Sequence, residues 1–384
     1  MSEEVIPVDH LITLADLLFK LSNETDKSNT TEQILQIVKE NDMAPYYEYL
    51  TENYSNSFKR DAQLVSELQK KNEEKHKELK DKLADVEENF GENEVREALL
   101  SIAEYHHKIG DKEKALEAYR QTTEKTVALG QRLDIVFAIQ RIGFSWLDMD
   151  LLRRNIEKAK SMIEEGGDWE RRNRLKVYEG LYLLIVRNFK GAASLFLESI
   201  ATFSSSELLS YERFVFYTII VSMISLERPE MKKRVVDSSD ILSVVGKIPH
   251  AADYLNSLYN CQYRDFLVAL VDITDEMKKD RFLSRHVHHY SREMRIRAYS
   301  QFLESYKSVT LSSTADQFGL GVIFLDQELS RFISAGRLNA KIDKVGGIIE
   351  TNRPDAKNAM YQQVIKHGDQ LLNRIQKLTR VVDL

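Results

Sequence analysis

Hydrophobic residues recur every three to four positions along most of the chain, and this spacing predicts helices up to about Ser305. In residues 1–58 it predicts two short amphipathic helices, Leu11–Leu21 and Thr31–Lys39, separated by a polar loop. Residues 59–92 follow as a charge-dense helix with a short apolar seam of Leu79, Leu83, Val86 and Phe90. We interpret it as a solvated helix with one packed end, and a coiled coil is the alternative.

Residues 93–205 repeat a pattern of small and aromatic residues. The spacing is typical of tetratricopeptide-like helical hairpins, in which small residues let paired helices approach and an aromatic ring fills the gap. The first match comprises Ala103, Gly110, Ala115 and Tyr119, and the second comprises Gly180, Ala192 and Phe196. A weaker helical pair lies between them, at about Leu133–Trp146 and Asn155–Ile163. Three such units would bury a continuous core and leave a concave surface for a partner.

Residues 206–305 continue the helical periodicity. The expected helices are Tyr211–Leu226, Ser239–Val245, Ala251–Asn260, Tyr263–Lys278 and His289–Tyr306. Pro229 and Pro249 mark boundaries, because the residue before a proline disfavours helical conformation. The pattern therefore predicts only helices, and no strand, in residues 206–305.

Residues 306–354 read as a winged helix. Val309-Thr310-Leu311 is a short β-branched run, and Ser313 stands three residues before Asp316, a capping-box spacing that opens a helix over Thr314–Phe318. Gly319-Leu320-Gly321 supplies the tight turn, since glycine accepts positive φ. A second helix stops at Gly336, and its apolar side consists of Val322, Phe324, Leu325, Leu329, Phe332 and Ile333.

The wing and a last helix complete the chain. Ala340–Val345 and Ile348–Asn352 are strand-like runs joined by a two-residue Gly346-Gly347 hairpin. In residues 355–384, a helix over Ala356–Arg380 carries one apolar side, formed by Met360, Val364, Leu371, Ile375 and Leu378. This helix is longer than a small winged domain can cover, so we expect it to pack partly against other chains.

The second helix of the winged module lacks the side chains that read DNA. A helix in the major groove needs Arg, Lys, Asn or Gln directed at bases and phosphates. Here Arg331 is the only basic residue, and Asp326 and Glu328 outweigh its charge. Gln327 is the one side chain that could contact a nucleobase. The wing is balanced, with Lys341, Lys344 and Arg353 against Asp343, Glu350 and Asp355. The module is therefore expected to pack on protein.

Composition agrees with this interpretation. The 384 residues carry a net charge of −6, with a pI of about 5.9, which argues against a constitutive nucleic-acid or anionic-membrane binder. The single Cys261 excludes an intrachain disulfide framework and suits a reducing cytosol or nucleus. Met1–Ile6 lacks the features of a signal peptide, and the longest apolar run, Phe214–Ile224, is too short to cross a bilayer. We expect a cytoplasmic and nuclear protein.

The order of these segments carries a family resemblance. Helical repeats followed by a winged helix and a long terminal helix resemble the PCI family, found in the proteasome lid, the signalosome and a translation initiation factor. Specific runs are similar to a PCI subunit of the proteasome lid from about Met43 to the C-terminus. They are Met43–Tyr47, Gly166–Tyr178, Asp326–Ile333, Ala340–Val345 and Glu350–Asp355.

The resemblance implies a non-catalytic structural subunit of the 26S proteasome lid, in a hetero-oligomer with other lid PCI subunits and the base ATPases. In PCI assemblies the wings associate side by side and the terminal helices bundle. The implied partner contacts are Val309, Thr310, Leu311, Ile342, Val345 and Ile349 on the sheet edge and wing, and Val364, Leu371, Ile375 and Leu378 on the terminal helix. The alternatives are a scaffold of the signalosome or initiation factor, and an RNA-binding PCI protein.

Two histidine motifs and one cysteine are the candidates for chemistry in this chain. His286-Val287-His288-His289 invites a zinc site, but a metalloprotease of PCI-containing complexes needs a later Ser and Asp, where this chain has Ile296 and Tyr299. An interface or solvated histidine cluster is favoured there, and His106-His107 is expected to be packed. Cys261 is expected to be a buried structural thiol.

Two other motifs carry no predicted chemistry. Gly319-Leu320-Gly321 lacks the third glycine of a dinucleotide loop. The arginines Arg171, Arg172 and Arg174 beside Trp169 are expected to pair with acidic neighbours, with RNA or phosphopeptide binding as the alternative. We predict no catalytic, metal or cofactor site.

Overall fold

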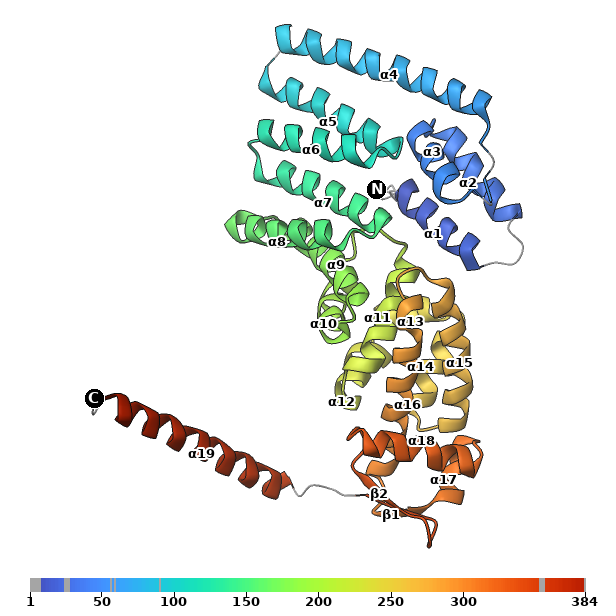
Figure 1. The fold of residues 1–384 in the computed structure, drawn as a ribbon, viewed down its shortest axis with the longest axis vertical. Helices are drawn as coiled ribbons and strands as arrows, with labels where there is room; N and C mark the ends of the chain where they lie inside the picture. The colour runs from blue at the N-terminus through green and yellow to red at the C-terminus, as the bar shows by residue number, and fades with distance from the viewer. Residues whose placement is uncertain are drawn as a thin grey trace. The chain divides into compact units, whose positions relative to one another are not determined.

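The computed structural model describes residues 8–23, 28–55, 57–58, 60–89, 91–351 and 356–382 (Figure 1). The chain divides into two compact units. Unit 1 comprises Met1–Asn260 with Val268–Ser291, and unit 2 comprises Cys261–Leu267 with Arg292–Leu384. The described residues confirm the predicted fold class of helical repeats, a winged helix and a long terminal helix.

Unit 1 begins with three short helices, α1 (His10–Asn23), α2 (Ser28–Glu40) and α3 (Ala44–Asn53). The first two match the predicted helices. The sequence pattern did not predict α3, although Pro45 stands in its first turn, where a missing N–H is tolerated. The buried side chains of this region form one apolar cluster that includes Leu14, Leu18, Ile34, Tyr47 and Leu50.

The predicted charged helix is α4 (Ala62–Asn89) and packs along its length, not at one end only. Val65 and Leu68 are buried, while Leu79, Leu83 and Val86 are half-buried. Between them, Tyr105 Oη donates to Asn72 Oδ1 at 3.0 Å, which ties α5 (Glu92–Lys108) to the middle of α4. Phe90, the last residue of the predicted seam, lies outside the described residues.

Three helical hairpins follow, as the repeat pattern predicted. They are α5 with α6 (Lys112–Lys125), α7 (Leu129–Trp146) with α8 (Met149–Gly166), and α9 (Trp169–Ile185) with α10 (Phe189–Ser199). Figure 1 shows α4 to α7 as successive layers. Ala103, Ala115 and Tyr119 are buried in the core of the first hairpin. A methyl group added at Gly180 would lie 2.5 Å from Phe196 Cε1, so only glycine allows this approach.

The three hairpins share one turn chemistry. In each, a residue with positive φ ends the first helix: Gly110 (φ 79°), Leu147 (φ 52°) and Arg187 (φ 70°). The next residue caps the second helix, because Asp111, Asp148 and Asn188 accept from the backbone N–H three positions on. The repeated turn identifies the units more sharply than the small residues do.

The rest of the predicted helical continuation is present. It comprises α11 (Tyr211–Ser225), α12 (Arg228–Met231), α13 (Ser239–Val245), α14 (Ala251–Tyr259), α15 (Tyr263–Lys279) and α16 (Val287–Glu304). A π-helical turn over Lys232–Val236 follows α12. Pro229 stands in the first turn of α12, which the periodicity did not predict. Short 3₁₀ turns cover Ile200–Thr202 and Ser284–His286.

Unit 2 contains the winged helix, with β1 (Ser308–Thr310), α17 (Leu311–Phe318), α18 (Val322–Ser334), β2 (Ala340–Asp343) and β3 (Ile348–Thr351). The strands form one antiparallel sheet of order β1-β3-β2. Val309 and Ile342 both pair with Ile349, on opposite sides of β3. The last helix, α19 (Ala356–Val382), follows the sheet in sequence.

Two local predictions in the winged helix are wrong. Thr310, not Ser313, caps α17, because its side chain accepts from Ser313 N at 3.3 Å and the helix already begins at Leu311. The hairpin has four residues between its strands, not two. Asp343 Oδ1 accepts from Val345 N at 2.9 Å, which ends β2 before the glycines.

Candidate interaction surfaces

The terminal helix α19 exposes an entire apolar side. Its large hydrophobic side chains from Met360 to Val382 are between 54% and 74% exposed. The predicted contacts Val364, Leu371, Ile375 and Leu378 belong to this surface. The opposite side is polar and includes Gln362, Lys366, Asn373, Gln376 and Arg380. A helix with this division is typically half of a protein–protein contact.

The apolar positions of α19 have coiled-coil spacing. Tyr361, Val364, Gly368, Leu371, Ile375, Leu378 and Val382 alternate three and four residues apart without a break. Ile365 and Leu372 lie beside this seam and widen it. A widened seam is typical of a helix that packs in a bundle of several helices. Tyr361, Ile365 and Leu372 were not among the predicted contacts, although the strict spacing is readable from the sequence.

The sheet edge and wing offer a smaller surface than predicted. Val345 is fully exposed at the hairpin tip, while Ile342 and Val309 are half-buried. Ile349 and Leu311 are buried, because β3 is the central strand and Leu311 faces inward from the start of α17. These two side chains pack inside unit 2 and present no contact surface. Thr310 is exposed, with its hydroxyl capping α17.

The apolar side of α18 also differs from the prediction. Leu325, Leu329 and Phe332 are buried, but Val322 and Phe324 are nearly half exposed. Ile323, which the sequence pattern did not single out, is 78% exposed. The first turn of α18 therefore presents apolar side chains where a DNA-reading helix would present donors.

Glu328 on α18 contacts two residues of α16. It is buried, accepts from Tyr299 Oη at 2.6 Å and lies 2.6 Å from Arg295 Nη1. Burial and the hydrogen bond to Glu328 raise the pKa of Tyr299 well above its usual value. Asp326 binds Lys344 of the wing at 3.1 Å. Both carboxylates of α18 are thus engaged inside unit 2. Two residues of the predicted charge balance of the wing, Arg353 and Asp355, lie outside the described residues.

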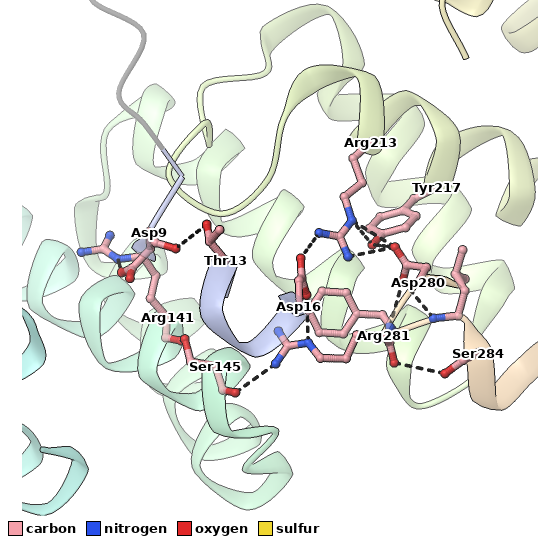
Figure 2. A network of polar contacts seen from close by, with 12 residues as sticks. Asp9, Thr13, Asp16, Arg141, Ser145, Arg213, Tyr217, Asp280, Arg281 and Ser284 are labelled. Carbon is pink, nitrogen blue, oxygen red and sulfur yellow. Dashed lines mark hydrogen bonds and ion pairs between the residues drawn. The ribbon is translucent and has the colours of Figure 1, made fainter. Parts of the chain in front are cut away.

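A polar network in unit 1 fastens α1 to the repeats (Figure 2). The Asp9 carboxylate lies 2.7 Å from His107 Nε2 and 3.3 Å from Arg141 Nε. Burial alone would raise the pKa of Asp9, but His107, Arg141 and His10 together hold it well below its usual value. The charge on Asp9 is therefore part of the folded structure.

The second half of this network is centred on Asp16. Its carboxylate pairs with Arg213 and lies 3.1 Å from Arg281 Nε. Asp280 accepts from Arg213 Nη2 at 2.8 Å and from Tyr217 Oη at 2.6 Å. Figure 2 shows the carboxylates of Asp16 and Asp280 on opposite sides of the Arg213 guanidinium. No local sequence pattern indicates this network, because its members are far apart along the chain.

The motif His286–His289 was expected to be a solvated or interface cluster, but only His288 is exposed, and His289 is half-buried. His286 is buried, with Nε2 3.0 Å from the Ile185 carbonyl oxygen and Nδ1 3.2 Å from Arg187 Nε. Burial lowers the pKa of His286. His106 and His107 are also buried, as predicted. Within the part of the chain that the structure describes, no group of three or more His, Cys, Asp or Glu residues is placed to hold a metal ion.

The remaining sequence motifs have structural partners. Arg171 binds Asp134 at 2.7 Å and Asp168 at 2.6 Å, which confirms the expected acidic pairing for this residue, whereas Arg172 is exposed. Arg174 likewise lies 2.6 Å from Glu207. Cys261 is half-buried, not fully buried as expected, and its sulfur accepts from Gln301 Nε2 at 3.3 Å. Among the described helices, none has the length and apolar content of a membrane span.

The chain is similar to known proteins over its whole length. The family model described as 26S proteasome subunit RPN7 matches residues 61–234, and the PCI domain model matches residues 263–353. The model of the 26S proteasome regulatory subunit RPN7/PSMD6 C-terminal helix matches residues 360–382, nearly all of α19. A rice protein named 26S proteasome non-ATPase regulatory subunit 6 is 53% identical over 388 residues, covering 100% of this chain and 99% of its own.

The chain belongs to the RPN7 family.

Other RPN7 relatives are similar over nearly the whole length. The 26S proteasome regulatory subunit RPN7 of Saccharomyces cerevisiae is 40% identical, covering 95% of this chain and 90% of its own. COP9 signalosome complex subunit 1 of Arabidopsis thaliana is only 27% identical, covering 51% of this chain and 45% of its own. The similarity of this RPN7 chain to proteasomal relatives is therefore both higher and more complete than its similarity to the signalosome subunit.

Proposed function

We propose that this chain is a non-catalytic structural subunit of the lid of the 26S proteasome regulatory particle, where it supports lid assembly and ubiquitin-dependent protein degradation. The observation that carries the proposal is the exposed apolar side of α19. It coincides with the segment matched by the RPN7/PSMD6 C-terminal helix model. Relatives that are 53% and 40% identical are named as regulatory subunits of the 26S proteasome.

The energetics of α19 favour a partner. Burying one Val, Leu or Ile side chain contributes about 1.5–3 kcal/mol. Ten large hydrophobic side chains of α19 are exposed: Met360, Tyr361, Val364, Ile365, Leu371, Leu372, Ile375, Leu378, Val381 and Val382. Covering their exposed surface in a helix bundle would offset a large part of the roughly 4–15 kcal/mol that association costs in lost freedom.

The partners we propose are other PCI subunits of the lid and the base ATPases, in a hetero-oligomer of the cytoplasm and nucleus. Val345 at the wing tip and the half-buried Ile342 and Val309 would add a second contact along the sheet edge. The engaged carboxylates and exposed apolar residues of α18 support a protein partner over nucleic acid.

The deciding experiment places two carboxylates in the seam. Leu371→Asp with Ile375→Asp should leave the circular dichroism of the free chain unchanged, because both side chains are already exposed. Incorporation into the lid should fail, since burying two unpaired carboxylates costs several kcal/mol. The matched control is Asn373→Asp with Gln376→Asp, which adds the same charge on the polar side of the helix.

Native gels and mass spectrometry of complexes purified through a tagged chain provide the measurement. The control variant should enter the lid like the wild type. Normal assembly of the seam variant would mean that α19 is a solvated tail. Recovery of signalosome or initiation-factor subunits without proteasomal ATPases would replace the proteasomal assignment.

The absence of catalysis is tested separately. Both ring nitrogens of His286 are occupied by Ile185 and Arg187, so we expect no metal-dependent cleavage of ubiquitin conjugates by the purified chain. The assay compares conjugate cleavage with and without zinc. Cleavage that persists in highly purified chain and disappears in His286→Ala would contradict the scaffold role.

A further inference from the structure

Two histidines meet where α4 packs against α5 in unit 1. The rings of His76 on α4 and His106 on α5 are 5.2 Å apart between centroids, in an edge-to-face arrangement. His106 is 7% exposed, and His76 is half-buried. The Nδ1 atom of each ring is buried and has no hydrogen-bond partner among the residues that the structure describes.

The buried Nδ1 atoms make the contact suited to neutral rings. A neutral imidazole has one N–H and one acceptor nitrogen, whereas an imidazolium donates from both nitrogens. Protonation would therefore place a donor on a buried Nδ1 that has no acceptor, which costs free energy. The closed contact of α4 and α5 accommodates His76 and His106 only while both are uncharged.

The charges that act on the pair also oppose protonation. Lys80 on α4 and Lys114 on α6 act on both rings. Asp111, in the turn between α5 and α6, favours protonation of His106. Its carboxylate, however, already lies 3.0 Å from Lys114 Nζ. A second positive ring at 5.2 Å would add to this repulsion.

Two further polar side chains flank the pair without supplying an acceptor to either Nδ1 atom. Glu73 stands one turn before His76 on α4 and is exposed, so that water weakens its effect. The ring of Tyr105 is 6.2 Å from that of His106, and its hydroxyl donates to Asn72.

The pKa directions agree with this geometry. Burial, followed by Lys80 and Lys114, lowers the pKa of His76 from 6.5. Burial, followed by the neighbouring His76, lowers the pKa of His106 from the same value. A separated pair of helices therefore binds protons more readily than the closed pair. The contact is favoured above pH 6.5 and weakens as the pH falls through that value.

The two halves of α4 are held with different strength. In the first half, Val65 and Leu68 are buried in the N-terminal apolar cluster. Gln69 Nε2 also donates to Glu48 at 2.8 Å, and Lys71 lies 2.9 Å from Asp42. Beyond His76, the apolar side chains Leu79, Leu83 and Val86 are only half-buried. A segment with so few buried contacts can open locally while the rest of the fold persists.

We propose that His76 and His106 form a pH-sensitive latch between α4 and α5. When both rings are neutral, the latch holds residues 77–89 of α4 against α5. When they are protonated, the rings repel each other and this half of α4 detaches, which exposes Leu79, Leu83 and Val86. The latch lies in unit 1, away from the seam of α19, so it does not depend on the lid function proposed above.

The test is hydrogen–deuterium exchange of the full chain at pH 7.5 and pH 5.5, followed by mass spectrometry and corrected for the intrinsic effect of pH on amide exchange. We expect the protection of residues 77–89 to fall about tenfold at pH 5.5, while residues 62–75 and α9 keep theirs. In His76→Gln with His106→Gln, protection of residues 77–89 should be independent of pH. His76→Phe with His106→Phe is a second uncharged pair, which keeps a ring at both positions, if the glutamine variant does not fold.

Two single variants complete the test. His106→Lys carries a permanent charge and should reduce the protection of residues 77–89 already at pH 7.5. The matched control is His288→Gln, which removes an exposed histidine and should open in acid like the wild type. Unchanged protection of residues 77–89 in the wild type, or an equal loss in the wild type and the uncharged pair, would overturn the proposal. Simultaneous loss over α9 would mean global acid unfolding and would overturn it as well.

Discussion

Asp16 in α1 forms an ion pair with Arg213 in α11, 197 residues further along the chain. Arg281 approaches the same carboxylate from the segment after α15. Asp16 is therefore shared by two arginines, of which the side chain of Arg281 is only 6% exposed. One residue of a short N-terminal helix thus neutralises charge from two distant parts of unit 1, which gives that helix a structural role.

Replacing Asp16 by Ala should destabilise unit 1 by about 3 kcal/mol, because two arginines lose a carboxylate inside the protein. Urea denaturation followed by circular dichroism measures the change. Glu32→Ala on α2 is the control, since Glu32 is exposed. A loss in Asp16→Ala no greater than in Glu32→Ala would show that the network has no net effect on stability.

Gly180→Ala should destabilise the third hairpin by about 1–3 kcal/mol, because the new methyl group would overlap the ring of Phe196. Gly246→Ala is the matched control. Nothing lies within 4 Å of its added methyl group, and its φ of −67° suits alanine. The control should be neutral or stabilising by about 0.4–1 kcal/mol. Equal thermal unfolding midpoints for the two variants would contradict the close packing of α9 and α10.

Tyr299→Phe should destabilise unit 2 by about 1.5–3 kcal/mol, because the buried Glu328 loses a hydrogen-bond donor. Tyr306→Phe, a partly exposed tyrosine of the same unit, should cost much less. Thermal unfolding of each full-length variant provides the comparison. If both substitutions had the same effect, Glu328 would not depend on the Tyr299 hydroxyl.

Acidification from pH 7.5 to pH 5 should lower the free energy of unfolding. Burial lowers the pKa of both His106 and His286 below the usual value of 6.5. As the pH falls through about 6.5, the unfolded chain binds protons that the folded chain does not, so unfolding becomes more favourable. The dependence should flatten in His106→Gln with His286→Gln.

The pH experiment compares the slope of unfolding free energy against pH, not the absolute stability of the variant. His367→Gln on α19 serves as the control, because that ring is exposed in the folded chain. An unchanged slope in the double variant would assign the acid sensitivity to other groups.

Local spacing predicted much of this fold because the relevant forces act within a few residues. Ala103, Ala115 and Tyr119 occupy the core positions that their spacing indicated. The cap of α17 was misassigned because Thr310 and Ser313 offer the same hydroxyl chemistry, and only the end of β1 selects Thr310. The length of the hairpin loop depends on Asp343, because its side chain accepts a hydrogen bond from the Val345 backbone N–H and so ends β2 before the two glycines.

Long-range relationships were not readable from one sequence. The partners of Asp9 and Asp16 come from helices many residues away, and no local pattern pairs them. The sheet order β1-β3-β2 buried Ile349, which the alternation of β3 alone did not reveal. Exposure of α19 was anticipated from its length, since one small domain cannot cover such a helix.

The apolar seam of α19 also has a consequence for the amount of this protein that a cell can keep. A chain made in excess of its partners would present ten large hydrophobic side chains to the surrounding solution. Such surfaces bind chaperones and promote self-association. Surplus copies would therefore be recognised as orphans and removed, so that the abundance of the chain follows that of its partners and not its own rate of synthesis.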